Sequence, residues 1–314
     1  MTPDTTTDVA ILALAVTGIL IAFTVIGESL RMRLPQGQTN PVVEAFNMRV
    51  HTWWGLAILL TLAILAGRIG IILLFAFASF AALREFLTFA RKRRADHLSL
   101  ALACFVILPL QYLFVGLDWT ALFTVFIPVY AFLLLLIVSA LRGDPTGFVG
   151  RVAETQWGLM ICVFCISHVP ALLTYDMPDG SDRSILLIVF LAMVIQLGDV
   201  AEYYAGRKFG KRRVAKELSP KTLEGMACGV LTAALIGAVL SWVTPFGALG
   251  AAAMAALASL TGMLGSLVFA AIKRDKGVKD WSHLIPGQGG LLDQLDSVIF
   301  AAPVFYHVTV WVFG

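Results

Sequence analysis

Residues 247–265 read GALGAAAMAALASLTGMLG, and the uncharged run continues to Ile272 before the basic pair Lys273 and Arg274. A helix needs about 20 predominantly apolar residues to cross the hydrocarbon core of a bilayer. The small side chains of this stretch also let neighbouring helices approach closely within a membrane. The stretch therefore predicts a membrane helix that packs against other helices.

The rest of the chain has the same character. Of its 314 residues 59% are hydrophobic and 14% are charged, whereas about a quarter of a soluble domain is charged. We therefore expect an all-α, polytopic integral membrane protein with about ten transmembrane helices, not a cytosolic enzyme or a disulfide-rich secreted domain. The net charge of +3 gives no indication of nucleic-acid binding. The apolar runs lie near residues 9–27, 53–67, 69–90, 98–117, 119–141, 155–174, 184–206, 223–243, 247–272 and 295–313.

The positions of the basic residues predict an orientation. With ten spans, 20 of the 23 Lys and Arg residues fall in loops on one side, whereas Arg68 and Arg183 fall on the other and Arg84 lies within a span. Basic loops remain on the cytoplasmic side of a membrane. We expect a multi-pass protein of the cell's inner (cytoplasmic) membrane with both termini facing outward.

The seventh span carries polar residues on one helical face. These residues are Gln196, Asp199, Glu202, Tyr203 and Arg207, which follow a three- and four-residue spacing. Ionisable groups inside a membrane are costly and often functional. The two carboxylates are suited to a divalent cation, which prefers oxygen ligands. The alternative is an ion pair with Arg207 along the same helix.

The next segment, residues 206–225, reads GRKFGKRRVAKELSPKTLEG and carries seven basic residues. Attraction to anionic lipid is sufficient to explain these charges. Ser219 and Pro220 are also typical of an N-cap and first helical turn. A second interpretation is a phosphate site, because a helix N-terminus beside Lys221 and Thr222 favours anions. Both interpretations remain open from these residues alone.

The densest polar segment, residues 273–297, reads KRDKGVKDWSHLIPGQGGLLDQLDS. Four basic residues and Asp280 precede a glycine turn, PGQGG at 286–290, whose backbone N–H groups are able to approach an anion. Asp293 and Asp296 follow on one face of the last helix. Acids in a first turn also favour the helix dipole. The combination is typical of a site for a metal ion and nucleotide phosphates.

Other ionisable residues in the spans have simpler interpretations. Arg84 and Glu85, late in the third span, are interpreted as neighbouring interfacial residues that neutralise one another. His168, near the outer end of the sixth span, and His307, among aromatic residues of the last span, are interpreted as structural.

The polar segments at residues 206–225 and 273–297 resemble those of the phosphatidate cytidylyltransferases, also called CDP-diacylglycerol synthases. The family's C-terminal signature is matched with its spacing at Lys273-Arg274, Lys279-Asp280, Ser282, Ile285, Pro286-Gly287, Gly289-Gly290, Asp293 and Asp296. A second conserved region resembles Asp199, Tyr203, Gly206-Arg207, Gly210-Lys211, Ser219-Pro220, Lys221-Thr222 and Glu224-Gly225. The resemblance covers most of residues 69–314, with site loops at 207–225 and 273–297. Residues 1–68 form N-terminal membrane helices that are not diagnostic.

The chain departs from the family pattern at several positions. Ala270 replaces the first serine of the signature, Gln288 a histidine and Gln294 an arginine. The Ser-Pro-x-Lys-Thr element is one residue short, and Glu202 replaces a small residue before Tyr203. The sequence is therefore interpreted as a divergent member of the family.

The resemblance implies that CTP and phosphatidate react to give CDP-diacylglycerol and pyrophosphate, with Mg²⁺ as cofactor. The residues assigned to catalysis are Asp280, Asp293, Lys221 and Lys279. Those assigned to substrate binding are Ser219, Thr222, Arg207, Lys273, Arg274, Gly287, Gln288, Gly289 and Gly290. Those assigned to the metal are Asp199, Asp293 and Asp296.

Other functions remain open from the sequence. A CTP-dependent lipid kinase of the polyprenol type, or a transferase acting on another lipid phosphate, would use similar basic loops. A non-catalytic paralogue that binds lipid or assembles with partners is the third possibility. Membrane lipids are expected around the protein, and the small residues of 247–265 also permit a homodimer.

Overall fold

The computed structural model describes residues 3–33, 40–90, 93–177, 183–285 and 289–313. In these residues ten helical segments are long and apolar enough to cross a membrane, so the predicted number of spans is confirmed. The only β-structure in the same residues is two isolated bridges, Arg213–Thr222 and Ile285–Gly289. The all-α class is therefore confirmed, and the chain is a multi-pass membrane protein.

Seven of the spans consist of one long helix each, apart from a short 3₁₀ turn after α11. They are α1 (Pro3–Met32), α2 (Pro41–Leu65), α3 (Gly67–Thr88), α10 (Ser184–Phe209), α11 (Leu223–Val239), α12 (Gly247–Asp275) and α13 (Leu291–Phe313). Three spans contain a π-helical turn between two α-helices. Their α-helices are α4 (His97–Leu102) and α5 (Leu108–Gly116), α6 (Thr120–Val125) and α7 (Phe132–Leu141), and α8 (Phe148–Leu159) and α9 (Ile166–Ala171).

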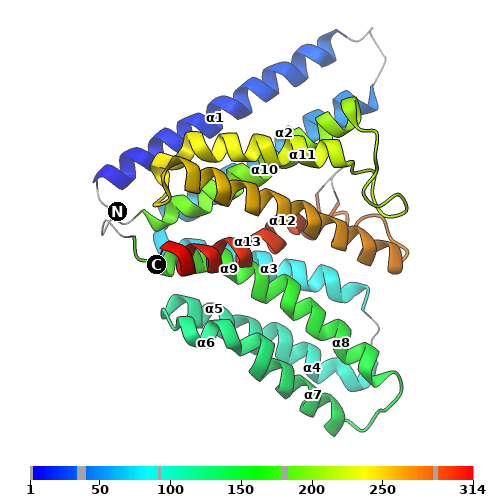
Figure 1. The fold of residues 1–314 in the computed structure, drawn as a ribbon. Helices are drawn as coiled ribbons and strands as arrows, with labels where there is room; N and C mark the ends of the chain where they lie inside the picture. Colours follow the sequence, from blue (N-terminus) through cyan, green and yellow to red (C-terminus); the bar gives the residue numbers. More distant parts are fainter. Residues whose placement is uncertain (1–2, 34–39, 91–92, 178–182, 286–288, 314) are drawn as a thin grey trace.

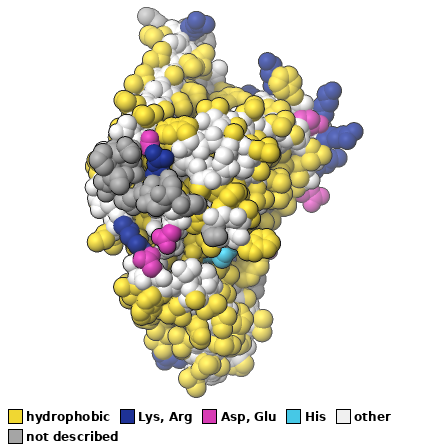
Figure 2. Space-filling model, turned by 60° about the vertical axis from the view of Figure 1, so that its left-hand side comes forward, with side chains coloured by type: hydrophobic (Ala, Val, Ile, Leu, Met, Phe, Trp, Pro, Cys, Tyr) yellow, Lys and Arg dark blue, Asp and Glu magenta, His cyan; other side chains and the backbone are white. Residues whose placement is uncertain are grey.

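Helices α10–α13 lie in the middle of the molecule, with α1 on one side and α4–α7 on the other (Figure 1). Helix α1 begins and helix α13 ends at the same end of the bundle, as an even number of spans requires. We call the opposite end the basic end. It contains the start of α2, α4, α8, α11 and α13 and the end of α3, α7, α10 and α12. Figure 2 shows apolar side chains over most of the visible surface and a group of Lys and Arg side chains at its right-hand edge.

Small residues bring α12 close to its neighbours, as the sequence predicts. A Cβ atom on Gly262 would lie 3.0 Å from the backbone oxygen of Ser297 in α13. A Cβ atom on Gly237 of α11 would lie 2.6 Å from the oxygen of Ala251 in α12. Because glycine leaves room for backbone at these contacts, α11, α12 and α13 pack as one unit that holds the polar residues at the basic end.

Two helices begin earlier than predicted. Helix α2 starts at Pro41, where the Asn40 side chain accepts a hydrogen bond from Val42 N at 3.0 Å, and not near residue 53. Its first turns contain charged residues, which a search for apolar runs omits. Helix α13 starts at Leu291 and not near 295, because a buried carboxylate caps it as described below. Both extensions add residues to the candidate site.

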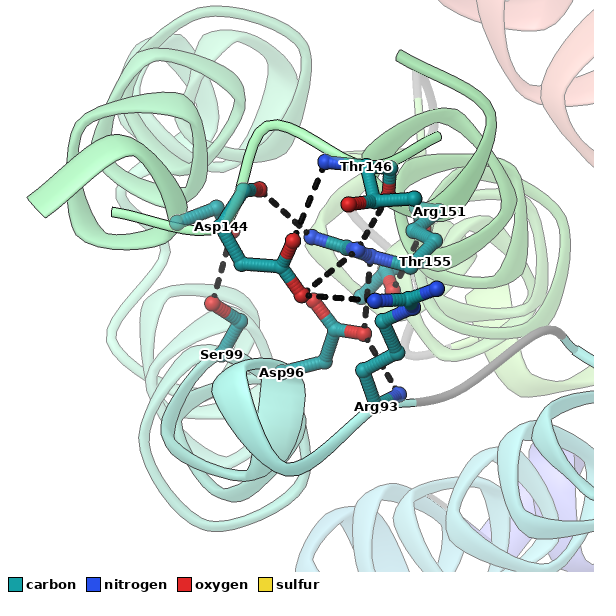
Figure 3. Close-up of polar contacts among 8 residues, drawn as sticks. Arg93, Asp96, Ser99, Asp144, Thr146, Arg151 and Thr155 are labelled. Atoms are coloured by element: carbon teal, nitrogen blue, oxygen red, sulfur yellow. Dashed lines mark hydrogen bonds and ion pairs between the residues drawn. The ribbon is translucent and has the colours of Figure 1, made fainter. Parts of the chain in front are cut away.

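A group of paired charges fixes α4 to α8 at the basic end (Figure 3). Arg151 is 5% exposed, and its guanidinium forms ion pairs with Asp96 at 3.1 Å and Asp144 at 3.3 Å. Arg93 also lies 3.4 Å from Asp144, and its backbone N–H donates to Asp96 at 2.8 Å. We call these four residues the Arg151 cluster. Its two cations and two carboxylates are paired with one another, so it is a structural connection between helices.

Candidate active site

Six residues of the C-terminal signature, Lys273, Lys279, Asp280, Gly289, Asp293 and Asp296, line a cavity of about 480 Å³ at the basic end. Its walls come from α2, α10, the end of α12, the segment that follows α12, and the start of α13. Asp199 of the second conserved region therefore lies in the same cavity as these residues, although about 70 residues separate it from Lys273 in the sequence. The lining residues are Arg49, Trp53, Gln196, Asp199, Val200, Lys273, Lys279, Asp280, His283, Gly289, Asp293, Gln294 and Asp296.

Asp293 organises the loop between α12 and α13. Its Oδ1 atom accepts from Lys273 Nζ at 2.7 Å, and its Oδ2 atom accepts from the backbone N–H groups of Trp281 at 3.0 Å and Gly290 at 2.8 Å. A carboxylate that accepts several charge-assisted bonds is held firmly in place. Both of its oxygens are thus engaged by protein groups, which is a structural function that the sequence did not predict.

Glu85 of α3 holds the next part of the same loop, from Leu291 onward. It accepts from Ser282 Oγ at 2.7 Å, Leu291 N at 3.0 Å and Leu292 N at 2.9 Å. Its side chain therefore satisfies two backbone N–H groups at the start of α13, which have no partner within the helix. The interpretation of Glu85 as an interfacial residue paired with Arg84 is wrong: it is 8% exposed and caps α13.

Gly289 and Gly290 are required because the carboxylates of Asp293 and Glu85 lie where a Cβ atom would be. A Cβ atom on Gly289, whose φ is +90°, would lie 2.5 Å from Asp293 Oδ2. A Cβ atom on Gly290 would lie 2.5 Å from Glu85 Oε2. Each glycine therefore leaves room for one carboxylate, and the N–H of Gly290 donates to Asp293.

Trp281 anchors this loop to the core. It is 2% exposed and stacks on Phe86 of α3 with ring centroids 5.4 Å apart. Phe89 and Phe269 contact its ring edge-on. Because Trp281 follows Asp280 directly, the buried indole fixes the position of the Lys279-Asp280 pair at the cavity wall.

Asp199 of α10 and Asp296 of α13 face the same cavity and repel one another electrostatically. The Oδ1 atom of Asp296 accepts from Ser297 N at 2.7 Å. Among the described residues, no group of three or more His, Cys, Asp or Glu side chains is placed to hold a metal ion. However, Mg²⁺ is commonly bound by one or two carboxylates, with water and substrate phosphates as the remaining ligands. The donor set of Asp199 and Asp296 fits that pattern, which brings together two of the three residues assigned to the metal.

The segment after α10 is tied back by carboxylates. Glu202 lies 3.2 Å from Lys221 Nζ, so the alternative interpretation, an ion pair with Arg207 along α10, is wrong for Glu202. Arg207 donates to the hydroxyl of Tyr203 at 3.4 Å instead. Lys221 also interacts electrostatically with Asp199, which places its ammonium group close to the cavity.

The N-cap of α11 is Thr222 and not Ser219. Thr222 accepts from the N–H of Gly225 at 3.2 Å, and the helix begins at Leu223. Ser219 accepts from the N–H of Lys221 at 3.3 Å in the preceding loop. The interpretation of Ser219 and Pro220 as the start of the helix is therefore wrong by three residues, because Thr222 is the residue that caps it.

The predicted site residues divide into three groups. Those that line the cavity are Asp199, Lys273, Lys279, Asp280, Gly289, Asp293 and Asp296. Those that do not line it are Arg207, Ser219, Lys221, Thr222, Arg274 and Gly290. Gly287 and Gln288 lie outside the described residues.

Several lining residues were missed by reasoning from the sequence. Arg49 and Trp53 come from the early turns of α2: Arg49 was assigned to a loop, and Trp53 was placed at the start of the predicted span without a function. His283 lies within the recognised signature segment but was given no function. An arginine four residues before a tryptophan, following the Asn-Pro helix start, is the signal that would have indicated a functional helix face.

The chain also resembles known proteins along most of its length. The model of the cytidylyltransferase family matches residues 47–312 and so includes most of α2. Uncharacterized protein YnbB of Escherichia coli is 37% identical over 294 residues, which are 92% of this chain and 94% of that protein.

Shorter matches carry a named activity. A phosphatidate cytidylyltransferase of Synechocystis is 33% identical over 42% of this chain and 46% of its own length. One of Bacillus subtilis is 29% identical over 67% of this chain and 77% of its own length. The family model covers well over half of the chain, and six of the residues that match the C-terminal signature line one cavity. The chain therefore belongs to the cytidylyltransferase family and is a nucleotidyltransferase.

Proposed function

We propose that this protein transfers the cytidylyl group of CTP to phosphatidate and releases pyrophosphate, in phospholipid biosynthesis. The observation that carries the proposal is the cavity in which Asp199 meets Lys279, Asp280 and Asp296. The named activity of the relatives from Synechocystis and Bacillus subtilis supports the choice of CTP and phosphatidate.

The reaction requires positioning and charge neutralisation more than proton transfer. A phosphate oxygen of the lipid forms a bond to the α-phosphorus of CTP, the bond from that phosphorus to the bridging oxygen breaks, and pyrophosphate leaves. Because the attacking oxygen is already anionic, no strong general base is needed. Lys273 and Lys279 are the cations on the α12–α13 side of the cavity, and we assign them to the triphosphate.

Mg²⁺ is the proposed cofactor, held by Asp199 and Asp296. When bound, it would neutralise charge on the phosphates. Asp293 is the less suited of the three acids assigned to the metal, because Lys273 and two backbone N–H groups already occupy its oxygens. In this proposal Asp293 acts chiefly by holding Lys273 and the glycine turn in place.

Gln294 replaces the arginine of the family signature and lines the cavity. Its amide is able to donate a hydrogen bond to a phosphate, but it carries no charge. Gln288, which replaces the signature histidine, lies outside the described residues. We propose that the remaining cations provide enough positive charge for turnover in this divergent member.

We propose that the basic end faces the cytoplasm of the cell, with both termini outward, in the inner membrane. Positive charge favours that side of a bilayer, and the cavity opens at the end where the basic loops gather. The division into residues 1–68 and 69–314 and the homodimer both stay predictions. The small residues of α12 contact α11 and α13 within one chain, so they are not reserved for a second copy.

The direct test uses CTP labelled either at the α-phosphate or at the γ-phosphate, with purified protein, phosphatidate and Mg²⁺. We expect lipid to acquire the α label only, and to acquire none with Asp296→Asn. Transfer of the γ label would identify a CTP-dependent lipid kinase. Absence of both labels from folded protein, with phosphatidate, with polyprenyl phosphate and with polyprenol, would contradict the proposal and favour a non-catalytic paralogue.

A further inference from the structure

Helix α2 contributes a cation to the cavity, from a part of the chain outside the family signature. Arg49 lines the cavity together with Trp53, one helical turn further along α2. Lys273, at the end of α12, and Lys279, in the segment that follows it, also line the cavity. The cavity therefore carries positive charge from two separate parts of the chain, and the proposed reaction brings two phosphate-bearing substrates together.

Arg49 has the surroundings of a ligand-binding arginine. Its guanidinium carbon lies over the face of the Tyr203 ring, 5.0 Å from the ring centre, in a cation–π contact. Among the described residues no carboxylate lies within ion-pair distance of it, in contrast to Lys273, which lies 2.7 Å from Asp293. A cation–π contact holds a guanidinium in place and leaves its N–H edge available for a bidentate phosphate.

The depth of Arg49 and Trp53 in the membrane fits a lipid better than a nucleotide. Helix α2 begins at the basic end, so Trp53 lies about 6 Å deeper than Arg49 at the usual helical rise. Tryptophan is favoured at the level of lipid head groups and the glycerol backbone. Further along the same helix Ile58 and Leu62 are more than half exposed, as expected of side chains that face acyl chains.

The balance of charges in the cavity also indicates that an anionic acceptor requires the positive charge of Arg49. Three cations, Arg49, Lys273 and Lys279, face four carboxylates, Asp199, Asp280, Asp293 and Asp296. One of the three cations is already bound to Asp293. Without Arg49, the wall formed by α2 and α10 would present only Asp199 as a charged group, and a lipid phosphate would be repelled there.

We propose that Arg49 binds the phosphate monoester of the acceptor lipid, with Trp53 against the glycerol region below it. The inference rests on the proposed function, because it divides the cavity between a lipid phosphate at α2 and CTP at α12–α13. Arg49 is thereby a residue that determines affinity for the acceptor.

The kinetic test compares Arg49→Gln with Arg142→Gln, which removes a cation at the basic end that does not line the cavity. In mixed micelles we expect Arg49→Gln to raise the KM for phosphatidate about tenfold to a hundredfold and to leave the KM for CTP within about twofold. Arg49→Lys should fall between these values, and Arg142→Gln should match the unmodified protein. An increase in the KM for CTP with no change for phosphatidate would overturn the proposal.

A binding test without CTP separates this inference from the proposed reaction. Brominated phosphatidate quenches tryptophan fluorescence, and the difference between the unmodified protein and Trp53→Phe isolates one of the seven tryptophans. We expect saturable quenching of Trp53 that requires at least tenfold more lipid in Arg49→Gln, and none with brominated phosphatidylcholine. Equal titrations with and without Arg49 would overturn the inference. If binding depends on Arg49 but no α label is transferred from CTP, the proposed function fails and the inference holds.

Discussion

The Arg151 cluster and the cavity both concentrate charge at the basic end, but they differ in how the charges are satisfied. The Arg151 side chain is 4% exposed and touches two carboxylates, and Arg93 supports one of them. In the cavity Lys273 has a carboxylate partner, whereas Arg49 and Lys279 have none among the described residues. The first group closes on itself, and the second remains open toward a space of about 480 Å³.

The difference separates charges that stabilise the fold from charges that bind a ligand. A buried ion pair whose members satisfy one another contributes rigidity, and loss of one member leaves an uncompensated charge. A cation that faces a cavity without a partner lowers the stability of the empty protein but is ready for an anion. Substitutions in the two groups should therefore affect different measurements.

The largest effect is expected from Asp296→Asn in the cavity. Loss of this carboxylate should lower kcat about 1,000-fold, equivalent to about 4 kcal/mol, because half of the proposed metal site is removed. The thermal midpoint should stay equal or rise, since Asp199 and Asp296 repel one another. Label transfer and thermal unfolding in the same detergent measure both. Activity within tenfold of the unmodified protein would show that Asp296 is not in the reaction site.

The reverse pattern is expected from Arg151→Gln. Asp96 and Asp144 would lose their buried partner, which should destabilise the protein by about 3 kcal/mol. The kcat of the molecules that remain folded should change by less than about twofold, because the cluster is not part of the cavity. Unfolding by heat and active-site titration of the folded fraction check this. A stable but inactive variant would place the cluster in catalysis and remove the distinction drawn above.

An intermediate effect on both quantities is expected from Glu85→Gln. An amide would keep the shape of the side chain, but its NH₂ group would meet the N–H donors at the start of α13. We expect a loss of about 1–3 kcal/mol in stability and roughly a tenfold lower kcat, because Gly289 and Gly290 would shift. Glu28→Gln is the control, since Glu28 is 45% exposed and its ion pair with Arg31, at 3.7 Å, lies at the surface. Equal effects of the two substitutions would contradict the capping function of Glu85.

The smallest effect concerns acid stability. The N–H of Thr146 donates to Asp144 and holds its pKa below the usual value of 3.8, and Arg93 and Arg151 act in the same direction. The stabilisation is therefore present above that value and is lost as the pH falls through the lower pKa of the folded state. Between pH 5 and pH 3 the thermal midpoint should decline slightly less in Asp144→Asn than in the unmodified protein. Identical declines would show that Asp144 contributes nothing to the pH dependence.

The spans were predictable because the length of an apolar run is a local property of the chain. All ten were found, and the small residues of α12 correctly indicated close packing. The start of α2 was missed because Asn40 and Pro41 determine where the helix begins, and the polar residues that follow them do not form an apolar run. Hydropathy alone therefore excluded Arg49 from a helix.

The candidate site was predictable only where residues resemble a family or lie close together in the sequence. The spacing of Asp293 and Asp296 placed both at the start of α13, as found. The function of Glu85 was not predictable, because the N–H groups that it caps lie 206 and 207 residues further along the chain. The pairing of Lys221 with Glu202 also depends on how the loop after α10 folds back.

The most direct test uses two lysines of one loop that differ in their partners. Lys276 Nζ lies 2.7 Å from Glu154, whereas Lys279 lines the cavity without a carboxylate partner among the described residues. Calorimetric titration of CTP with Mg²⁺, in the absence of lipid, measures binding without turnover. We expect Lys279→Gln to weaken CTP binding roughly tenfold to a hundredfold, and Lys276→Gln to leave it within about twofold. Equal binding by all three proteins would contradict the claim that Lys279, an unpaired cation of the cavity, holds the nucleotide.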